Sequence, residues 1–348
     1  MASRRSMTDT EASSMDAAPV RWPEEVDAVI SGDLTAAAAY VTAAGGAVVT
    51  GVAPCGLADR SQGVVGFTTS LGFPQKLRRI IRDPHVTLAF HAREHGFADS
   101  PWFVLLQGHA AVDLTPSRTR LESFKPQAER FMGHMKQGPL WDQLLHEYYE
   151  ERVFIDISVA RIVAWQDMSG TGEPEVYGAP RPPAPPPQAP PKLGVAPRVD
   201  VARLNRQVGR LAHHLLAYRG ADGFPVVVPV GVTGHSPAGL HLTAAPGLLP
   251  SGDRRAGLLA HSYRPQLIGL STRTGTGWLH PQEDGRAVYA PHTSKGFFAP
   301  PAKNLLLVSN GLMAKYGMRR ARASGLVEEL QRLAESGPDS PAAEPPGR

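Results

Sequence analysis

The feature that most constrains this chain is a proline-dominated segment, EPEVYGAPRPPAPPPQAPPKLGVAP, at residues 173–197. Proline lacks a backbone N–H and fixes φ, so such a segment suits neither a helix nor a central strand. It favours extended polyproline II, and about 25 residues at ~3.1 Å each would span on the order of 80 Å. The segment is therefore predicted to be a linker between two bodies of similar size. A ligand for an SH3-like partner is the functional alternative.

The 348 residues are too many for one small domain and suit two domains with linkers. We predict a first domain over residues 21–170, the linker over 171–198 and a second domain over 199–335. The polar ends, residues 1–20 and 336–348, are expected to be disordered tails.

Charge and cysteine content exclude several classes of protein. There are 36 Lys+Arg against 32 Asp+Glu, a net charge of +4, and this small scattered excess gives no reason to expect a nucleic-acid partner. The single cysteine, Cys55, excludes an internal disulfide and a Cys-rich metal site. No apolar run is long enough to cross a bilayer, and the start resembles no secretory signal. We therefore expect a cytoplasmic protein with a small-molecule substrate and no membrane partner.

The first body alternates short strand-like segments with few helices. Its strand-like segments are rich in β-branched and apolar residues and are bounded by Gly, Pro or Asp: AAYVTAAGG, AVVTGVAP, GVVGFTTS, HVTLAFH, FVLLQGHAAVD and VFIDISVARIVAW. A short helix is expected in PQKLRRIIRD, where Pro74 suits the first turn and Asp83-Pro84 ends it. Longer helical patterns occupy residues 117–135 and 140–151. Many short strands with one inserted helix predict a closed antiparallel barrel.

The second body is expected to begin with one long amphipathic helix over residues 199–220. Its apolar stripe contains Val201, Leu204, Val208, Leu211 and Leu215. Strand patterns follow in PVVVPVGVTG, in GLHLTAAPG, in QLIGLSTRTGTGWL and over residues 285–291. A final helical region is expected from about residue 302 to 336, interrupted near Gly317.

The two bodies share a weak internal repeat. GFTTS…LRRIIRDPHVTLAF in the first aligns with LHLTAAPG…RRAGLLAHSYRPQLIGLS in the second. This alignment pairs Thr68 with Thr243, which are 175 positions apart, and Pro84 with Pro265, which are 181 apart, so it places a six-residue insertion in the second copy. Two unrelated β-rich domains are the alternative.

The most informative stretch for chemistry is residues 63–91. A strand ends in the hydroxyl run Thr68, Thr69 and Ser70, and Lys76 follows in the first turn of the short helix. A cation there opposes the helix macrodipole, which favours anions at this end. Hydroxyls, free N–H groups and a lysine together predict a phosphate site. The alternative is that Lys76 belongs, with the arginines at 78, 79 and 82, to a solvated helix face, but this leaves the hydroxyl run unexplained.

The order of a hydroxyl-ending strand, a Lys-x-x-Arg helix and the strand RDPHVTLAF resembles the flavin-binding split-barrel superfamily, over about residues 35–165. This superfamily includes pyridoxamine-phosphate oxidases and flavin- or deazaflavin-dependent reductases. The resemblance implies a mainly β fold of tandem split β-barrels that binds FMN. It gives the cofactor phosphate to Thr68, Thr69, Ser70 and Lys76.

The same resemblance implies further site residues. The strand containing Thr50, Val52 and Pro54 would pass under the isoalloxazine ring, and Gln107 would supply a polar side chain. Arg79 stands where many relatives have asparagine, so phosphate or ribityl contacts would differ. The arginine and histidine set that binds the substrate phosphate of true pyridoxamine-phosphate oxidases is not found, so we do not expect vitamin B6 oxidation.

Other reactive residues have simpler readings. The pairs His213-His214 and His146-Glu147 lack the i, i+4 histidine spacing and third ligand of a metalloenzyme, so no metal site is expected. Cys55 is interpreted as a free buried cysteine that plays no redox part.

These observations predict an FMN-dependent oxidoreductase that passes hydride through the flavin to or from a small organic substrate. Because the flavin performs that chemistry, no catalytic side chain is assigned. Deazaflavin F420 is the alternative cofactor, and a haem- or flavin-binding protein without turnover is the alternative class. A degenerate second barrel would make the chain an internal pseudo-dimer, with His261, Arg264 and His292 as possible contributors to the site. A homodimer through the first barrel is the competing arrangement.

Overall fold

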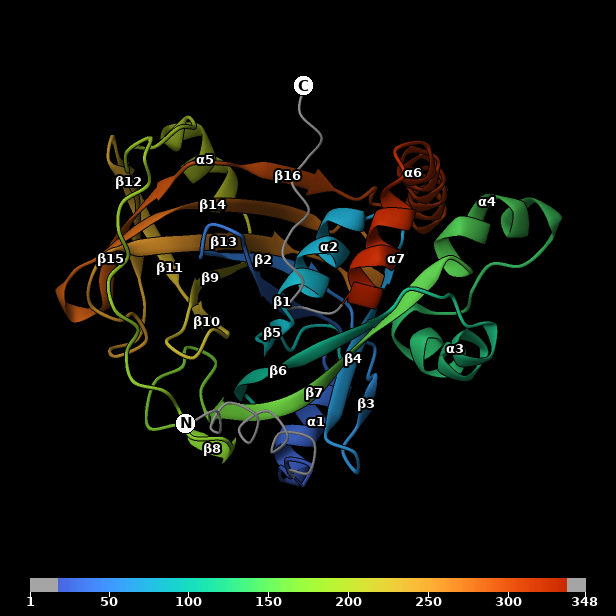
Figure 1. Ribbon diagram of the computed structural model, residues 1–348, viewed down its shortest axis with the longest axis horizontal. Helices are drawn as coiled ribbons and strands as arrows, with labels where there is room; N and C mark the ends of the chain where they lie inside the picture. The colour runs from blue at the N-terminus through green and yellow to red at the C-terminus, as the bar shows by residue number, and fades with distance from the viewer. Residues whose placement is uncertain (1–17, 337–348) are drawn as a thin grey trace, which may run out of the picture.

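The computed structural model describes residues 18–336, so most of the first expected tail and nearly all of the second lie outside the described residues. Within this range the chain forms two antiparallel sheets of eight strands each, with few helices (Figure 1).

The first sheet has the strand order β2-β1-β5-β6-β7-β4-β3, and β8 pairs with β7. Its strands are β1 Ala36–Val41, β2 Ala47–Val52, β3 Ala58–Asp59, β4 Val64–Ser70, β5 His85–Phe90, β6 Phe103–Asp113, β7 Arg152–Trp165 and β8 Glu175–Gly178. The helices of this half are α1 Glu24–Gly32, α2 Pro74–Arg82, α3 Arg118–Met132 and α4 Pro139–Tyr149. The predicted helices at 74–82, 117–135 and 140–151 are therefore present.

The second sheet has the order β10-β9-β13-β14-β15-β12-β11, and β16 pairs with β14. Its strands are β9 His213–Arg219, β10 Pro225–Pro229, β11 Gly231–Ser236, β12 Gly239–Thr243, β13 Arg254–Ser262, β14 Ser271–Pro281, β15 Arg286–Pro291 and β16 Lys295–Phe298. Helix α5, Val201–Val208, precedes them, the 3₁₀ turns η2 Pro265–Leu267 and η3 Glu283–Gly285 lie between them, and α6 Lys303–Ala323 and α7 Leu326–Ser336 follow.

The two sheets repeat one topology strand for strand, and their registers agree. The first hairpin closes around residues 42–46 and its counterpart around residues 220–224. In both hairpins the first loop N–H donates to the last loop carbonyl at 2.8 Å, Thr42 to Gly46 and Gly220 to Phe224. The chain is a tandem of split β-barrels. The predicted fold is confirmed.

The ladders also test the predicted repeat residue by residue. Counting residues along the hydrogen-bonded strand pairs of each sheet places Thr68 and Thr243 at equivalent positions, as predicted. The pairing of Pro84 with Pro265 is wrong, because β5 corresponds to β13, the segment RRAGLLAHS that the sequence alignment matched to a helix. Most of β13 is buried on both faces, so it lacks the alternation that marks an exposed strand. Helix α2 has no counterpart between β12 and β13 in the described chain.

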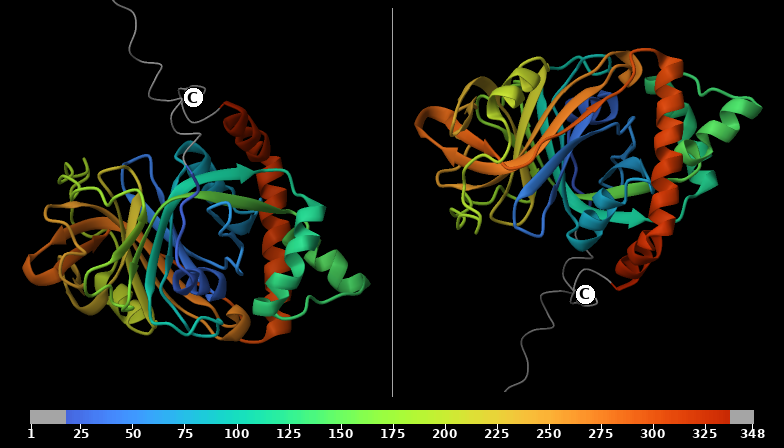
Figure 2. Two further views of the ribbon diagram at one scale, coloured as in Figure 1. Left: turned by 90° about the horizontal axis from the view of Figure 1, so that it is seen from below. Right: turned by 90° about the horizontal axis from the view of Figure 1, so that it is seen from above.

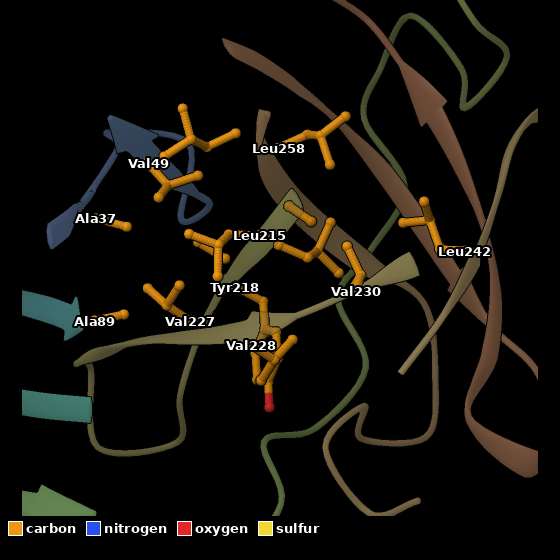
Figure 3. Close-up of a cluster of buried hydrophobic side chains, with 14 of the residues drawn as sticks. Ala37, Val49, Ala89, Leu215, Tyr218, Val227, Val228, Val230, Leu242 and Leu258 are labelled. Carbon is orange, nitrogen blue, oxygen red and sulfur yellow. The ribbon is translucent and has the colours of Figure 1, made fainter. Parts of the chain in front are cut away.

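The two barrels pack against each other through matching elements. Strand β2 lies against β9, β13 and β14, and its counterpart β10 lies against β1, β5 and β6. Such a self-complementary contact is the kind made by twofold dimers. The shared core contains Ala37, Val49 and Ala89 from the first barrel together with Leu215 and Leu258 from the second (Figure 3). A separate core fills the first barrel.

Two helix predictions differ from the structure. Helix α5 ends at Val208, because Gly209 follows it and residues 213–219 form the central strand β9, where Leu215 and Leu216 are both buried. Helix α6 continues through Gly317 and ends before Gly325, whose φ is +64°. Glycine at 317 allows close packing: a Cβ there would lie 2.6 Å from the carbonyl oxygen of Gly72.

The proline-rich segment connects the two sheets but is not a free spacer. Its first part is strand β8, and Gln188 donates from its side chain to the Gly45 carbonyl at 2.8 Å and from its backbone N–H to the Asp253 carbonyl at 2.8 Å. After the second barrel, α6 and α7 return to the first barrel (Figure 2). There α6 packs on α4 and α7 packs on α2.

Candidate functional site

The predicted phosphate site contains a cation that the sequence analysis missed. Arg152 begins β7, and its register places it beside the end of β4. Its guanidinium donates to the Thr68 hydroxyl oxygen from Nε at 2.9 Å and from Nη2 at 2.7 Å. Nη2 also reaches the Thr68 carbonyl oxygen at 3.2 Å. Thr68 is 9% exposed, and Arg152 is half-buried beside it.

Lys76 lies in the first turn of α2, as predicted, with its ammonium 5.5 Å from the centroid of the Phe67 ring. Burial, together with the charge of Arg152, lowers the pKa of Lys76 to about 8. No carboxylate in residues 18–336 forms an ion pair with Lys76. Lys76 and Arg152 therefore lie close enough for their charges to interact, and neither pairs with a carboxylate in residues 18–336. We call Thr68, Lys76 and Arg152 the cradle.

The other two predicted hydroxyls serve different purposes. Side chains alternate along a strand, so Thr69 shares the face of Phe67, which belongs to the core of the first barrel. The Ser70 hydroxyl accepts a hydrogen bond from the Gly72 N–H at 3.1 Å and shapes the turn into α2. Only Thr68 of the run contacts a cation.

The remaining arginines of α2 are explained by other contacts. Arg78 and Arg82 both reach Glu329 of α7, at 2.6 and 3.6 Å. Arg79 lies 6.0 Å from the centroid of the Tyr40 ring; burial raises the pKa of the Tyr40 hydroxyl, and Arg79 opposes that rise. The basic face of α2 is thus occupied by α7, whereas Lys76 takes no part in this pairing.

The side chains of strand β2 pack into two different hydrophobic cores. Val49 belongs to the core shared by both barrels, whereas Val52 belongs to the core of the first. By strand alternation Thr50 points the same way as Val52. The chain then reaches Pro54 and Cys55, both buried. Burial raises the pKa of Cys55 to about 11 despite the charge of Arg152, so Cys55 is a protonated thiol at neutral pH.

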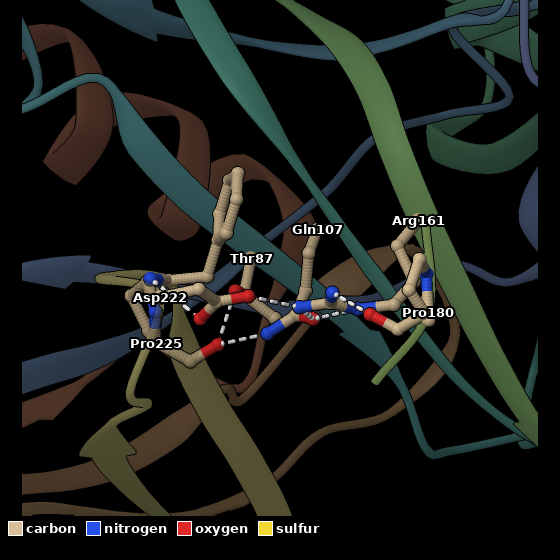
Figure 4. Close-up of polar contacts among 7 residues, drawn as sticks. Thr87, Gln107, Arg161, Pro180, Asp222 and Pro225 are labelled. Atoms are coloured by element: carbon tan, nitrogen blue, oxygen red, sulfur yellow. Dashed lines mark hydrogen bonds and ion pairs between the residues drawn. The ribbon is translucent and has the colours of Figure 1, made fainter. Parts of the chain in front are cut away.

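Gln107 lies in a different network, which joins the barrels. Its side-chain oxygen accepts from Arg161 at 2.8 Å (Nε) and 2.6 Å (Nη2), and its amide donates to the Pro225 carbonyl at 2.7 Å (Figure 4). Arg161 also pairs with Asp222 at 2.6 Å. Thr87 donates to the same Pro225 carbonyl at 2.6 Å. The polar contacts of Gln107 go to this network and not to the cradle.

The three candidates from the second barrel are dispersed. His261 meets His91 of the first barrel, with the two Nε2 atoms 2.6 Å apart. Arg264 is exposed after β13, and His292 lies 3.3 Å from the Val195 carbonyl oxygen. The second barrel instead contributes Tyr263, which packs in a small cluster with Cys55.

The histidines between the barrels form a compact cluster but not a metal site. The ring of His213 lies 5.6 Å from that of His91 and 5.1 Å from that of His261, and Glu94 pairs with His213 at 3.1 Å. Burial lowers the pKa of His91 to about 3 and that of His261 to about 2. Within residues 18–336, no group of three or more His, Cys, Asp or Glu is placed to hold a metal ion.

The cradle has no equivalent in the second barrel. The same counting that equates Thr68 with Thr243 places Asp284 at the position of Arg152. Helix α2 and its lysine are missing there, as described above. An acidic residue thus replaces one cation, and the other has no counterpart in the described part of the second barrel.

Comparison with solved structures finds chains that each match less than half of this protein. One solved structure, a conserved hypothetical protein from Mycobacterium tuberculosis, is 18% identical, with a TM-score of 0.32 over 45% of this chain and 93% of the other. A putative pyridoxamine 5'-phosphate oxidase from Listeria innocua is 13% identical, with a TM-score of 0.29 over 41% and 98%. A structure titled F420 reductase is 17% identical, with a TM-score of 0.31 over 42% and 100%.

Pyridoxamine-phosphate-oxidase-like proteins are among its structural neighbours. No protein-family profile matches the chain, and no curated protein matches its sequence. Between residues 18 and 336, no helix has the length and apolar character needed to cross a bilayer.

Proposed function

We propose that the protein is an FMN-dependent oxidoreductase whose first barrel binds the cofactor phosphate in the cradle. The observation that carries this proposal is that Arg152 donates to the Thr68 hydroxyl while Lys76, whose charge interacts with that of Arg152, has no paired carboxylate in residues 18–336. Burying cations without counter-charge is costly, and a phosphate dianion would offset that cost. Arginine and lysine together suit a phosphate through charge-assisted hydrogen bonds.

Each residue of the cradle has a distinct part in this proposal. Arg152 is held by Thr68 before any ligand arrives, so its guanidinium loses little freedom on binding. Lys76, which has no ion-pair partner in the described chain, supplies a second charge that is free to turn toward the phosphate. Bound FMN would supply hydride transfer to or from a small organic substrate, and the chain would supply position and exclusion of water.

Helix α6 bears on how that exclusion would be achieved. Gly317 and Ala314 of α6 contact Gly72, which lies in the turn between the hydroxyl run and Lys76. The contact depends chiefly on glycine at 317, where a Cβ would lie 2.6 Å from the Gly72 carbonyl oxygen; a Cβ on Gly72 would lie 3.2 Å from the Ala314 carbonyl oxygen and would need only a small shift. The C-terminal helix therefore covers the turn at the cradle and would shield a phosphate from water on that side.

The experiment is an equilibrium titration of FMN, riboflavin and F420 into the full chain and Lys76→Ala. Loss of a charge-assisted phosphate contact should weaken FMN binding about ten- to hundredfold. Riboflavin, which lacks the phosphate, should bind weakly and equally to both proteins. Arg78→Ala is the matched control, since Arg78 already pairs with Glu329. Equal FMN affinity for wild type and Lys76→Ala would reject the cradle, whereas tighter binding of F420 would replace FMN as the cofactor.

A further inference from the structure

A second cavity lies between the barrels, away from the cradle. It has a volume of about 160 Å³ and is bordered by β6 and β7 of the first barrel, β10 of the second and residues 181–185 of the proline-rich segment. A cavity of about 150 Å³ in another protein is large enough for benzene. This cavity therefore has room for a single six-membered ring and is too small for a flavin.

The walls of the cavity are mostly apolar, with two aromatic residues among them. Trp165 and Tyr218 come from opposite barrels, and aliphatic side chains such as Val163 and Val228 complete the surface. The Tyr218 hydroxyl is already used, since it donates to the Leu248 carbonyl at 2.8 Å. These walls favour an apolar ring and offer few hydrogen bonds to its centre.

The arginines at or near the cavity carry an excess of positive charge. Arg161 is balanced by Asp222, but Arg181 lies 5.8 Å from the Trp165 ring and pairs with no carboxylate in the described part of the chain. Behind Tyr218, Arg254 is 1% exposed and donates to the backbone carbonyls of residues 185, 251 and 252. Carbonyl groups satisfy its N–H groups without neutralising its charge. The cavity therefore favours a ligand with a negative group.

Arg161 offers one further polar contact. Its guanidinium has five N–H groups, of which four are used: two by Gln107, one by Asp222 and one by the Pro180 carbonyl at 2.6 Å. The fifth belongs to Nη1. A carboxylate beside Arg161 could therefore accept a hydrogen bond from Nη1 without breaking the network that joins the barrels.

We propose that this cavity binds a small aromatic carboxylate, with the ring among the apolar side chains near Trp165 and Tyr218 and the carboxylate toward Arg181 and Arg161. The site does not depend on the proposed flavin chemistry. Its cover is thin, because Arg181 and residues 183 and 184 of the proline-rich segment are exposed. A ligand could therefore enter from the side of this segment without separating the barrels.

Benzoate is the probe, titrated calorimetrically into the full chain, with benzyl alcohol as its neutral analogue. We expect one benzoate per chain and binding at least about fivefold tighter than that of the alcohol. Arg181→Met should weaken the binding of benzoate by about fivefold and leave the binding of benzyl alcohol unchanged. Arg198→Met is the matched control, since Arg198 directly follows the proline-rich segment and does not border the cavity.

Two filling variants test the location. Val228→Phe occupies the cavity from β10, and Ala184→Phe occupies it from the exposed segment, where a larger side chain does not disturb the fold. Both should abolish benzoate binding, and Lys76→Ala should not change it. No benzoate binding by the wild type, equal binding of the alcohol, or full binding by Ala184→Phe would each overturn the proposal.

Discussion

His91 and His261 occupy equivalent positions in the two barrels, and their Nε2 atoms meet at 2.6 Å. The strand pairing places Thr87 and Gly257 at equivalent positions in the two sheets. His91 lies four residues after Thr87, and His261 lies four residues after Gly257. The pseudo-twofold axis of the molecule therefore passes between the two rings. The two rings differ in where they carry a proton. His91 donates from Nδ1 to the Ala89 carbonyl oxygen at 3.0 Å, so its Nε2 has no proton and accepts the hydrogen bond that His261 Nε2 donates.

This pair should make stability depend on pH. Burial lowers the pKa of His91 to about 3 and of His261 to about 2, against 6.5 in the unfolded chain. The folded state thus binds fewer protons, and stability present above pH 6.5 is lost as the pH falls toward 3. We expect a loss on the order of 1–2 kcal/mol per histidine between pH 7 and 5, measured by urea unfolding.

His261→Gln isolates the contribution of the pair. The variant should be less stable than wild type at pH 7, and this difference should shrink at pH 5. His235→Gln, at an exposed position, should follow the wild-type curve at both values. A constant difference between His261→Gln and wild type across this range would show that the histidine does not titrate with folding.

A close backbone approach between the barrels, at Gly257, should be sensitive to a single methyl group. A Cβ on Gly257 would lie 2.5 Å from the Ala47 carbonyl oxygen, a backbone atom that cannot move aside alone. Gly257→Ala should therefore lower the free energy of unfolding by about 1–3 kcal/mol. The matched control is Gly51→Ala, because the added Cβ there has nothing within 4 Å. Equal stability of the two variants would contradict this packing.

Binding of a phosphate in the cradle should weaken in alkali. The pKa of Lys76 is lowered to about 8, so its ammonium is present below that value and is lost above it. Between pH 7 and 9 the affinity for FMN should fall by up to about tenfold. Lys76→Arg stays charged throughout and should give a flat profile. Fluorescence titrations at pH 7, 8 and 9 measure both, and a wild-type profile as flat as that of Lys76→Arg would exclude Lys76 from binding.

Cys55 should be inert in the folded protein. Its thiol is 5% exposed, and burial raises its pKa to about 11. A thiol reagent at pH 8 should react with less than one equivalent until the protein is unfolded, and Cys55→Ser should bind FMN as the wild type does. Rapid reaction of the native protein would show that the site opens.

The phosphate site was predictable from the sequence only where its residues are neighbours in the chain. Thr68 and Lys76 are joined by one turn, so a hydroxyl run and a lysine at a helix start were enough to find them. Arg152 reaches Thr68 only through the pairing of β4 with β7, and no local pattern encodes that pairing. Gln107 was assigned by resemblance alone, yet the second barrel, through Asp222 and Pro225, engages its side chain and that of Arg161.

The secondary-structure predictions also failed where the structure depends on contacts remote in sequence. The prediction of one helix over residues 199–220 was right only as far as Val208, because a strand buried on both faces resembles one stripe of a helix. Likewise Gly317 suggested a break, but its role depends on the distant Gly72. In both cases a contact remote in sequence decided the local structure.

The missing helix of the second barrel shows what covalent linkage of the two copies permits. In a dimer of identical chains, every substitution appears twice, so both sites are kept or lost together. In this chain the two copies can change independently: one has Arg152 and α2, whereas the other has Asp284 and a plain loop. The second copy lacks both cations of the cradle and can be selected for its contacts with the first. Because both copies lie in one chain, the pairing of two different barrels is intramolecular and does not depend on the protein concentration.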